Sequence, residues 1–174
     1  MRLHFWPMVR EPQSGSGARM LHDDGQSLDA YLVWIGEIPH LRATGFELIE
    51  ITKEHAIGRI PYRIEHVGNP MTGVVHGGIV TTLLDTVGGA AVIGRLGKSL
   101  TMVTLDLRID YLRPSTPQHD LFARVECYKL TRNIAFTRGM AYNHDPEDPL
   151  ASMSATYMLR TPTQRRGDAG EVGR

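Results

Sequence analysis

The chain has 174 residues, a formal net charge of zero and no basic run longer than two residues. It therefore lacks the electrostatic footprint of a nucleic-acid-binding protein, and nucleic acid is excluded as an expected partner. No run approaches the ~18 apolar residues of a membrane span, and the N-terminus has no apolar leader segment, so we expect a cytoplasmic protein without a membrane partner.

Both ends of the chain differ in composition from its middle. Residues 1–26 and 161–174 are rich in Gly, Ser, Pro and charged residues. Such segments have little apolar surface to bury, so we predict a flexible N-terminal extension and a disordered C-terminal tail. Residues 27–160 remain for one domain. A helix is predicted at the start of that domain, with Ser27 as its cap.

The middle of the chain contains one long helical pattern between strand-like segments. From Gly77 to about Leu96, apolar residues recur every three or four positions, and the segment is too long for a strand. The other periodic segments alternate with period two, as strands do, and lie at 46–64, 101–112, 121–130, 134–143 and 150–159. The order predicts an α+β domain in which a single helix lies against a strongly curved antiparallel sheet.

The stretch "GVVHGGIVTTLLDTVGGAA" contains the strongest candidates for catalytic groups in the sequence. Gly77 and Gly78 at a helix start expose backbone N–H groups at the positive end of the helix dipole, where a carbonyl developing negative charge could bind. The alternative is that these glycines only permit a tight turn between strand and helix.

Asp85 lies further along the same helical pattern. It shares a helix face with small and polar residues, namely Gly78, Thr81, Thr82, Gly88 and Gly89. A glycine inside a helix costs ~1 kcal/mol relative to alanine, which suggests that a ligand or another backbone comes close to this face. The alternative for Asp85 is a buried hydrogen-bonding role or a contact between helices.

Several common catalytic motifs are missing from the sequence. It has no serine-hydrolase elbow, no Walker sequence, no dinucleotide fingerprint and no paired cysteines or histidines at zinc-ligand spacing. The eight histidines are scattered along the chain. We therefore do not expect a metal site, and serine-hydrolase, NTPase and dinucleotide-binding functions lose their usual support.

The segments "NPMTGVVHGGIVTTLLDTVGGAA" and "MVTLDLRIDYLRP" resemble a hotdog-fold thioesterase of the phenylacetate-degradation (PaaI) type. The hallmark of that family is an HGG turn followed by an aspartate nine residues after the histidine. The resemblance implies a curved antiparallel sheet wrapped around one long central helix. It also implies hydrolysis of acyl-CoA thioesters by a homodimer, arranged as a dimer of dimers, without metal or organic cofactor.

By position, the resemblance assigns catalytic roles to five residues. Asp85 would be the nucleophile or general base, and the Gly77 N–H would polarise the thioester carbonyl. His76 would orient the turn, Asn69 would handle the thiolate side or position water, and Thr104 would help to hold water.

Thr104 can help to hold water only if its side chain points toward the helix, which depends on the geometry of its strand. In a regular strand it faces the side opposite to Val103 and Leu105, so it reaches the helix only if the strand is irregular there.

Further residues are candidates for substrate binding. Gly78 and Thr82 lie on the face of Asp85, Val92 is a candidate for the pocket wall, and Arg132 is a candidate contact for a coenzyme A phosphate. Nothing in the sequence selects the acyl group. Two other functions stay open: a non-catalytic acyl-CoA-binding protein, and a hydratase or dehydratase of the same fold, which would need a histidine and a carboxylate facing one α-carbon.

Helix geometry adds one expectation about assembly. Gly77 and Asp85 are eight residues apart, which corresponds to ~12 Å along a helix. The attacking group must come within ~3–3.5 Å of the carbonyl carbon. One chain cannot satisfy both, so we predict an obligate homodimer whose sites combine Asp85 of one subunit with the Gly77 turn of the other.

Overall fold

The computed structural model describes residues 19–20 and 25–160. Most of the predicted N-terminal extension and the whole predicted C-terminal tail lie outside the described residues. Within the extension, Arg19–Met20 forms strand β1, which pairs in parallel with strand β2. The first helix begins at Gly25, two residues before the predicted cap Ser27.

The described elements follow the predicted order. They are β1 (Arg19–Met20), α1 (Gly25–Glu37), α2 (Pro39–Thr44), β2 (Glu47–Ile51), β3 (Ala56–Ile60), the 3-10 turn η1 (Ile64–His66), β4 (Val67–Asn69), β5 (Val74–Val75), α3 (Gly77–Leu96), β6 (Thr101–Tyr111), β7 (Leu121–Leu130), β8 (Ile134–Tyr142) and β9 (Ala151–Arg160). The segment predicted as strand at 46–64 is therefore two antiparallel strands, β2 and β3.

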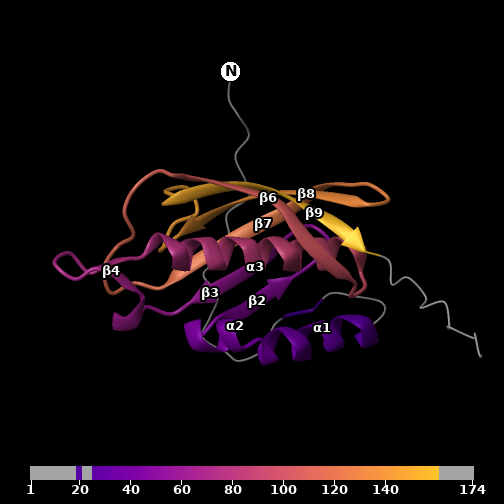
Figure 1. Ribbon diagram of the computed structural model, residues 1–174, viewed down its shortest axis with the longest axis horizontal. Coiled ribbons are helices and arrows are strands. Elements are labelled where there is room, and N and C mark those ends of the chain that lie inside the picture. The colour runs from indigo at the N-terminus through magenta and orange to yellow at the C-terminus, as the bar shows by residue number, and fades with distance from the viewer. Residues whose placement is uncertain (1–18, 21–24, 161–174) are drawn as a thin grey trace, which may run out of the picture.

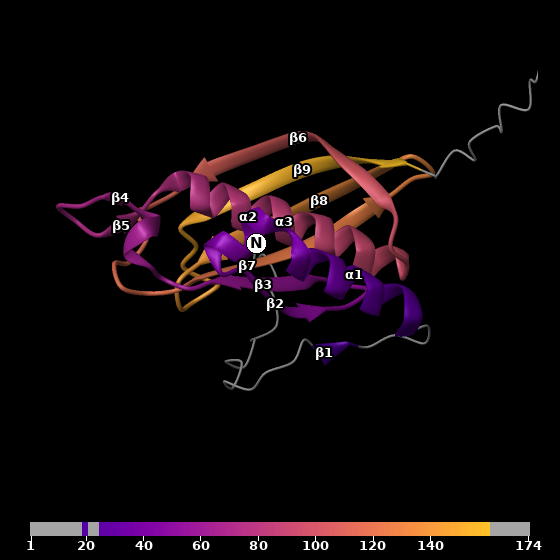
Figure 2. The same cartoon turned by 60° about the horizontal axis from the view of Figure 1, so that its bottom comes forward.

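The main sheet wraps around α3, as the sequence predicts. Its strand order is β1-β2-β3-β7-β8-β9-β6, and every pair beyond β1 and β2 is antiparallel. Figure 1 shows α3 lying along the curved sheet, and Figure 2 shows α1 and α2 in front of α3. The α+β class and the arrangement of one long helix inside a curved sheet are confirmed.

The core lies between α3 and the concave side of the sheet. Leu83, Leu84 and Val87 of α3 are fully buried and pack with inward residues of the strands such as Val125. Burying a side chain of this size contributes roughly 1.5–3 kcal/mol. The helix is thus fixed to the sheet by its apolar side, and its other side is left for α1, α2 and the site.

By length and composition, α3 could cross a membrane, which differs from the expectation that no segment approaches such a span. In this fold more than half of its most apolar stretch is buried. A helix enclosed by its own sheet needs to be apolar over most of its surface, so the core accounts for its hydropathy.

Strand β6 contains the irregularity on which Thr104 depends. Its pairing with β9 shifts register between Thr104 and Asp106, as at a β-bulge. Because a bulge inverts the alternation of faces, Met102 lies on the inner side before it and Leu107 lies on the inner side after it. The regular alternation predicted for this strand is wrong in its first half, where Val103 and Leu105 are 45% and 51% exposed.

Two helical glycines give a matched test of the packing between α3 and β2. A Cβ atom at Gly94 would collide with the backbone carbonyl oxygen of Thr52, whereas a Cβ at Gly36 would meet nothing within 4 Å. We expect Gly94→Ala to destabilise the fold by about 1–3 kcal/mol, since backbone cannot move aside easily. Gly36→Ala should be neutral or stabilise by up to ~1 kcal/mol.

Chemical denaturation of both variants measures these free energies. Equal stability of Gly94→Ala and the wild type would contradict the close contact between α3 and the end of β2.

Candidate active site

The N-terminus of α3 is capped by His76. This residue has extended backbone angles, and its ring Nδ1 accepts a hydrogen bond of 2.9 Å from the Gly78 N–H. The Ile79 N–H donates to the His76 carbonyl at 2.9 Å. Among the described residues, no group accepts a hydrogen bond from the Gly77 N–H. The turn therefore presents one unused donor at the positive end of a 20-residue helix.

Tyr111 ties this turn to the end of β6. Its hydroxyl donates to the Gly77 carbonyl at 2.9 Å and lies 3.1 Å from the Thr81 hydroxyl. A Cβ at Gly77 would lie 3.1 Å from the same hydroxyl, so a larger residue would crowd it. Sequence reasoning did not find Tyr111, because the contact joins residues 34 positions apart.

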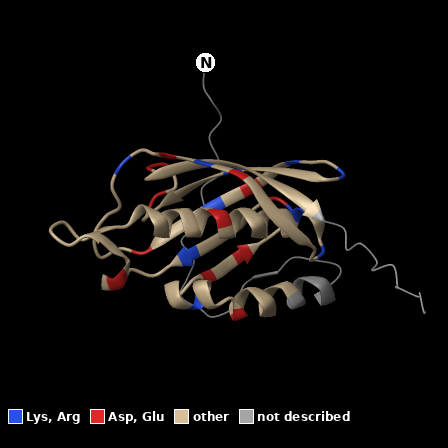
Figure 3. Cartoon of the chain, viewed as in Figure 1, with Lys and Arg blue, Asp and Glu red and all other residues tan. Residues whose placement is uncertain are grey.

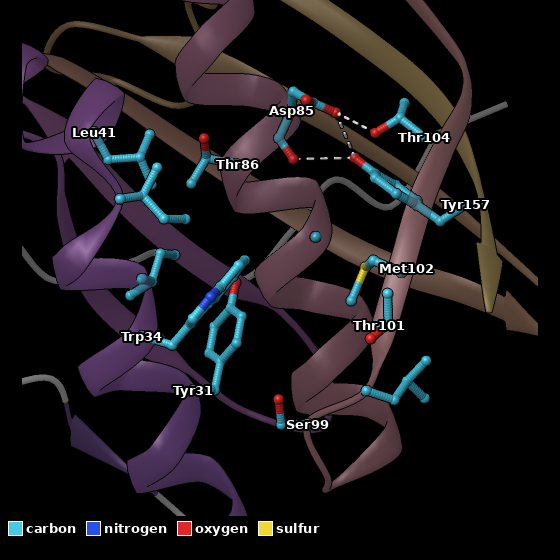
Figure 4. A pocket seen from close by; sticks show the side chains of 14 residues that line it. Tyr31, Trp34, Leu41, Asp85, Thr86, Ser99, Thr101, Met102, Thr104 and Tyr157 are labelled. Atoms are coloured by element: carbon cyan, nitrogen blue, oxygen red, sulfur yellow. Dashed lines mark hydrogen bonds between the residues drawn. The ribbon is translucent and has the colours of Figure 1, made fainter. Parts of the chain in front are cut away.

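Asp85 lies in the middle of α3, partly buried, with a hydrogen-bond donor on each of two strands. The Thr104 hydroxyl donates to its Oδ1 at 3.0 Å. The Tyr157 hydroxyl lies 3.1 Å from the Asp85 carbonyl oxygen and 3.4 Å from Oδ1 (Figure 4). The condition set for Thr104 is met, because the bulge in β6 turns its side chain toward α3.

Tyr157 on β9 is 2% exposed. Burial, and after it the charge of Asp85, raise the pKa of this phenol, so it stays protonated and remains a donor. Gly88 makes room for it, because a Cβ there would collide with the Tyr157 hydroxyl. Gly88 is thus buried against its own sheet, and the group that comes close to it is the Tyr157 side chain.

A cavity of about 620 Å³ begins at Asp85 and Thr104. It runs between α1, α3 and the first half of β6, with Trp34 and Met102 among its walls (Figure 4). Its size is that of a pocket for a small organic ligand. The cavity therefore joins the carboxylate to a space that can hold a substrate.

The structure does not bring all predicted site residues to this cavity. His76, Gly77, Gly78, Thr82, Asn69 and Arg132 are absent from its lining. Thr82 donates to the Gly78 carbonyl and contacts the His40 ring. Asn69 is exposed, and its side chain accepts from the Met71 N–H in the turn between β4 and β5.

Two predicted binding residues lie elsewhere in the fold. Val92 is fully buried in the core and does not line the cavity. Arg132 is exposed in the link between β7 and β8.

The charges around the site are few. Asp85 and Arg95 are the charged residues of α3, and Figure 3 shows the other charged residues spread over strands, loops and the helices α1 and α2. In the part of the chain that the structure describes, no three His, Cys, Asp or Glu residues are grouped to hold a metal ion. Burial raises the pKa of the Cys127 thiol, which disfavours it as a nucleophile. Among the described residues that line the cavity, Asp85 is the one that carries a charge.

Known proteins resemble this chain in sequence and in fold. Residues 72–150 match the Thioesterase superfamily. The medium/long-chain acyl-CoA thioesterase YigI of Escherichia coli K12 is 29% identical over 140 residues, which are 73% of this chain and 89% of YigI.

Two solved structures extend the likeness. A protein from Pseudomonas aeruginosa is 36% identical with a TM-score of 0.69, over 77% of this chain and 98% of that chain. The Escherichia coli PaaI protein from the phenylacetic acid degradation operon is 18% identical with a TM-score of 0.67, over 77% of this chain and 92% of that chain, and so shares the fold.

The contact between Tyr157 and Asp85 can be tested by stability. Tyr157→Phe removes the buried hydroxyl and its hydrogen bonds, and a lost bond of this kind costs about 0.5–1.5 kcal/mol. We expect the melting temperature to fall by a few degrees. The control is Tyr128→Phe, because Tyr128 is exposed on β7. Equal melting temperatures for both variants, measured by circular dichroism, would show that the Tyr157 hydroxyl does not hold α3.

Proposed function

We propose that this chain, a member of the thioesterase superfamily with the hotdog fold, is an acyl-CoA thioester hydrolase in which Asp85 and the Gly77 N–H, from two subunits, carry out the reaction together. The resemblance to PaaI-type thioesterases is confirmed at the level of family and fold. The observation that carries the proposal is the carboxylate of Asp85, held by Thr104 and Tyr157 at the end of a substrate-sized cavity.

A thioester suits a site with a single carboxylate. The thioester carbonyl is more electrophilic than that of an oxygen ester, and a thiolate leaves easily, so a carboxylate and one or two backbone donors are sufficient. Thr104 and Tyr157 both reach Oδ1 of Asp85. Oδ2 has no hydrogen-bond partner among the described residues, so it is the oxygen that can act on substrate.

Asp85 can act by two routes. As a nucleophile, its oxygen bonds to the carbonyl carbon while the carbon–sulfur bond breaks, and the coenzyme A thiolate leaves and takes a proton. Water then hydrolyses the acyl anhydride and restores the carboxylate. As a general base, Asp85 instead takes a proton from the water that attacks the same carbon; the carbon–sulfur bond then breaks, and the proton passes from Asp85 to the leaving thiolate.

The Gly77 N–H is the proposed donor to the carbonyl oxygen in either route. It has no partner among the described residues, and it points from the N-terminus of α3, where the helix dipole favours negative charge. His76 would keep the turn in shape through its bond to the Gly78 N–H. Asn69 stays a proposed group for the thiolate or a water, although its side chain is bonded within its own turn.

The free edge of the sheet supports assembly of this site from two chains. Among the described strands β6 pairs with β9 alone and forms one edge of the sheet. This edge strand has 11 residues, and Val103 and Leu105 on it are exposed. A long edge with unpaired backbone groups and exposed apolar side chains tends to pair with a strand of another chain. Antiparallel pairing of two β6 strands about a two-fold axis would lay two α3 helices side by side, with Gly77 of one near Asp85 of the other.

Other features of the proposed function follow from the family. Two such dimers would associate as a dimer of dimers, in the cytoplasm, and the reaction would need neither metal nor organic cofactor. Arg132 on the surface stays a proposed contact for a coenzyme A phosphate. A hydratase or dehydratase of the same fold stays the alternative, and thiol release distinguishes it, because only hydrolysis frees coenzyme A from the acyl group.

The substitution Asp85→Asn tests the catalytic assignment. It keeps the shape of the side chain but removes the charge that attacks or takes a proton, so turnover of a cleaved acyl-CoA should fall ~100-fold or more while the protein stays folded. The measurement is thiol release from a panel of acyl-CoA substrates without added metal.

Asp148→Asn is the matched control. Asp148 is exposed, forms an ion pair with Arg113 and does not line the cavity. Removal of its charge should therefore change turnover by no more than about twofold. Near wild-type activity of Asp85→Asn would show that another group does the chemistry. Binding of acyl-CoA by the wild type without cleavage of any substrate would favour the non-catalytic acyl-CoA-binding protein.

A further inference from the structure

The cavity at Asp85 has a polar end and an apolar remainder. At the polar end, Asp85, Thr104 and the Tyr157 hydroxyl converge (Figure 4). Most of the remaining wall is apolar, with Trp34 and Ile35 from α1, and with Leu100 and Met102 on the side of β6. Asp85 is the one charged residue among the described residues that line it. This polarity fits a ligand with one reactive polar group and a long apolar part.

We propose that this cavity binds an unbranched acyl chain of medium length, lying along α1 with its thioester at Asp85, and that α1 sets the length that is accepted. The proposal rests on the proposed hydrolysis at Asp85 and specifies the substrate class. It gives α1 a function that the sequence pattern did not indicate, because the helix supplies a wall of the cavity as well as core residues.

The length of the cavity follows from β6. Thr104 contacts Asp85, and Leu100, four residues earlier in the chain, lines the opposite part together with Ser99. Four residues of extended chain cover ~13 Å at ~3.3 Å each. A fully extended chain advances ~1.2 Å per bond, since three backbone bonds span at most ~3.6 Å. The cavity therefore has room for an acyl chain of about ten carbons.

Gly89 lies where a larger side chain would shorten this space. It is one turn beyond Asp85 on α3, ~6 Å along the axis, and it lines the cavity. A Cβ at Gly89 would meet only the Met102 sulfur, at 3.8 Å. The position can therefore accept a side chain without a collision with backbone, and that side chain would occupy the path of the acyl chain after about five carbons.

Trp34 is the part of the wall that can open. Its side chain lines the cavity, yet the residue is 60% exposed. Few contacts hold it on its outer side, so its removal would open the cavity to solvent without removing a core residue. Chains longer than the cavity could then extend past α1.

The test is the chain-length profile of kcat/KM for saturated acyl-CoA substrates from butyryl to palmitoyl. The wild type should be most active with about 8–12 carbons. Gly89→Leu should lower kcat/KM for decanoyl-CoA by ~10-fold or more and leave butyryl-CoA within about threefold. Trp34→Ala should raise the activity with palmitoyl-CoA relative to decanoyl-CoA.

Matched controls separate these effects from general damage. Gly36→Leu places the same side chain on α1 at a position with nothing within 4 Å of a Cβ, and Val33→Ala truncates an exposed neighbour of Trp34. Neither residue lines the cavity, so both variants should keep the wild-type profile.

A binding measurement distinguishes failure of this inference from failure of the proposed function. Calorimetry with S-alkyl-CoA thioethers, which cannot be hydrolysed, measures the affinity of the cavity for the alkyl chain without turnover. Tight binding of the decyl thioether that is lost in Gly89→Leu supports the cavity assignment even if no thioester is cleaved. A flat chain-length profile, or one that Gly89→Leu leaves unchanged, overturns it.

Discussion

The rigidity of α3 is the constraint on which the proposed chemistry depends. The helix carries a free backbone donor at Gly77 and a carboxylate at Asp85, and an α-helix of this length keeps the two ~12 Å apart. Its apolar side is fixed in the curved sheet, so it cannot bend to bring them together. A site that uses both groups on one carbonyl must therefore take them from two helices, and we propose that a second chain pairs at the open edge of β6.

The surroundings of Asp85 show how the fold holds a carboxylate ready for reaction. The bulge in β6 turns Thr104 inward, and Gly88 leaves space for the buried Tyr157 hydroxyl. Both donors contact Oδ1, so the side chain has one restrained oxygen and one without a hydrogen-bond partner among the described residues. In the proposed binding mode, the acyl chain packs on the apolar walls of the cavity beyond Asp85, and the thioester meets the polar groups.

The sequence alone predicts the fold and points to the candidate site, because both depend on local patterns. Periodicity identifies α3 and the strands, and the HGG turn with Asp85 lies within one short segment. The rest depends on register and long-range contacts. A bulge depends on how two strands pair, which the sequence of one strand does not show. The sequence therefore predicts an inward Thr104 only if its strand is irregular. Tyr157 lies 72 residues from Asp85 and has no motif of its own. Val92, a candidate for the pocket wall from the sequence, is fully buried in the core and does not line the cavity.

Complementation between two inactive variants tests the shared site most directly. Asp85→Ala removes the carboxylate, and Gly77→Pro removes the N–H at a first helical position, where proline fits the backbone. Refolded together, half of the dimers are mixed and each mixed dimer has one intact site of two, so activity should return to roughly a quarter of the wild-type value. Absence of activity in mixed dimers that mass spectrometry shows to be folded would contradict this account, because each site would then lie within one chain.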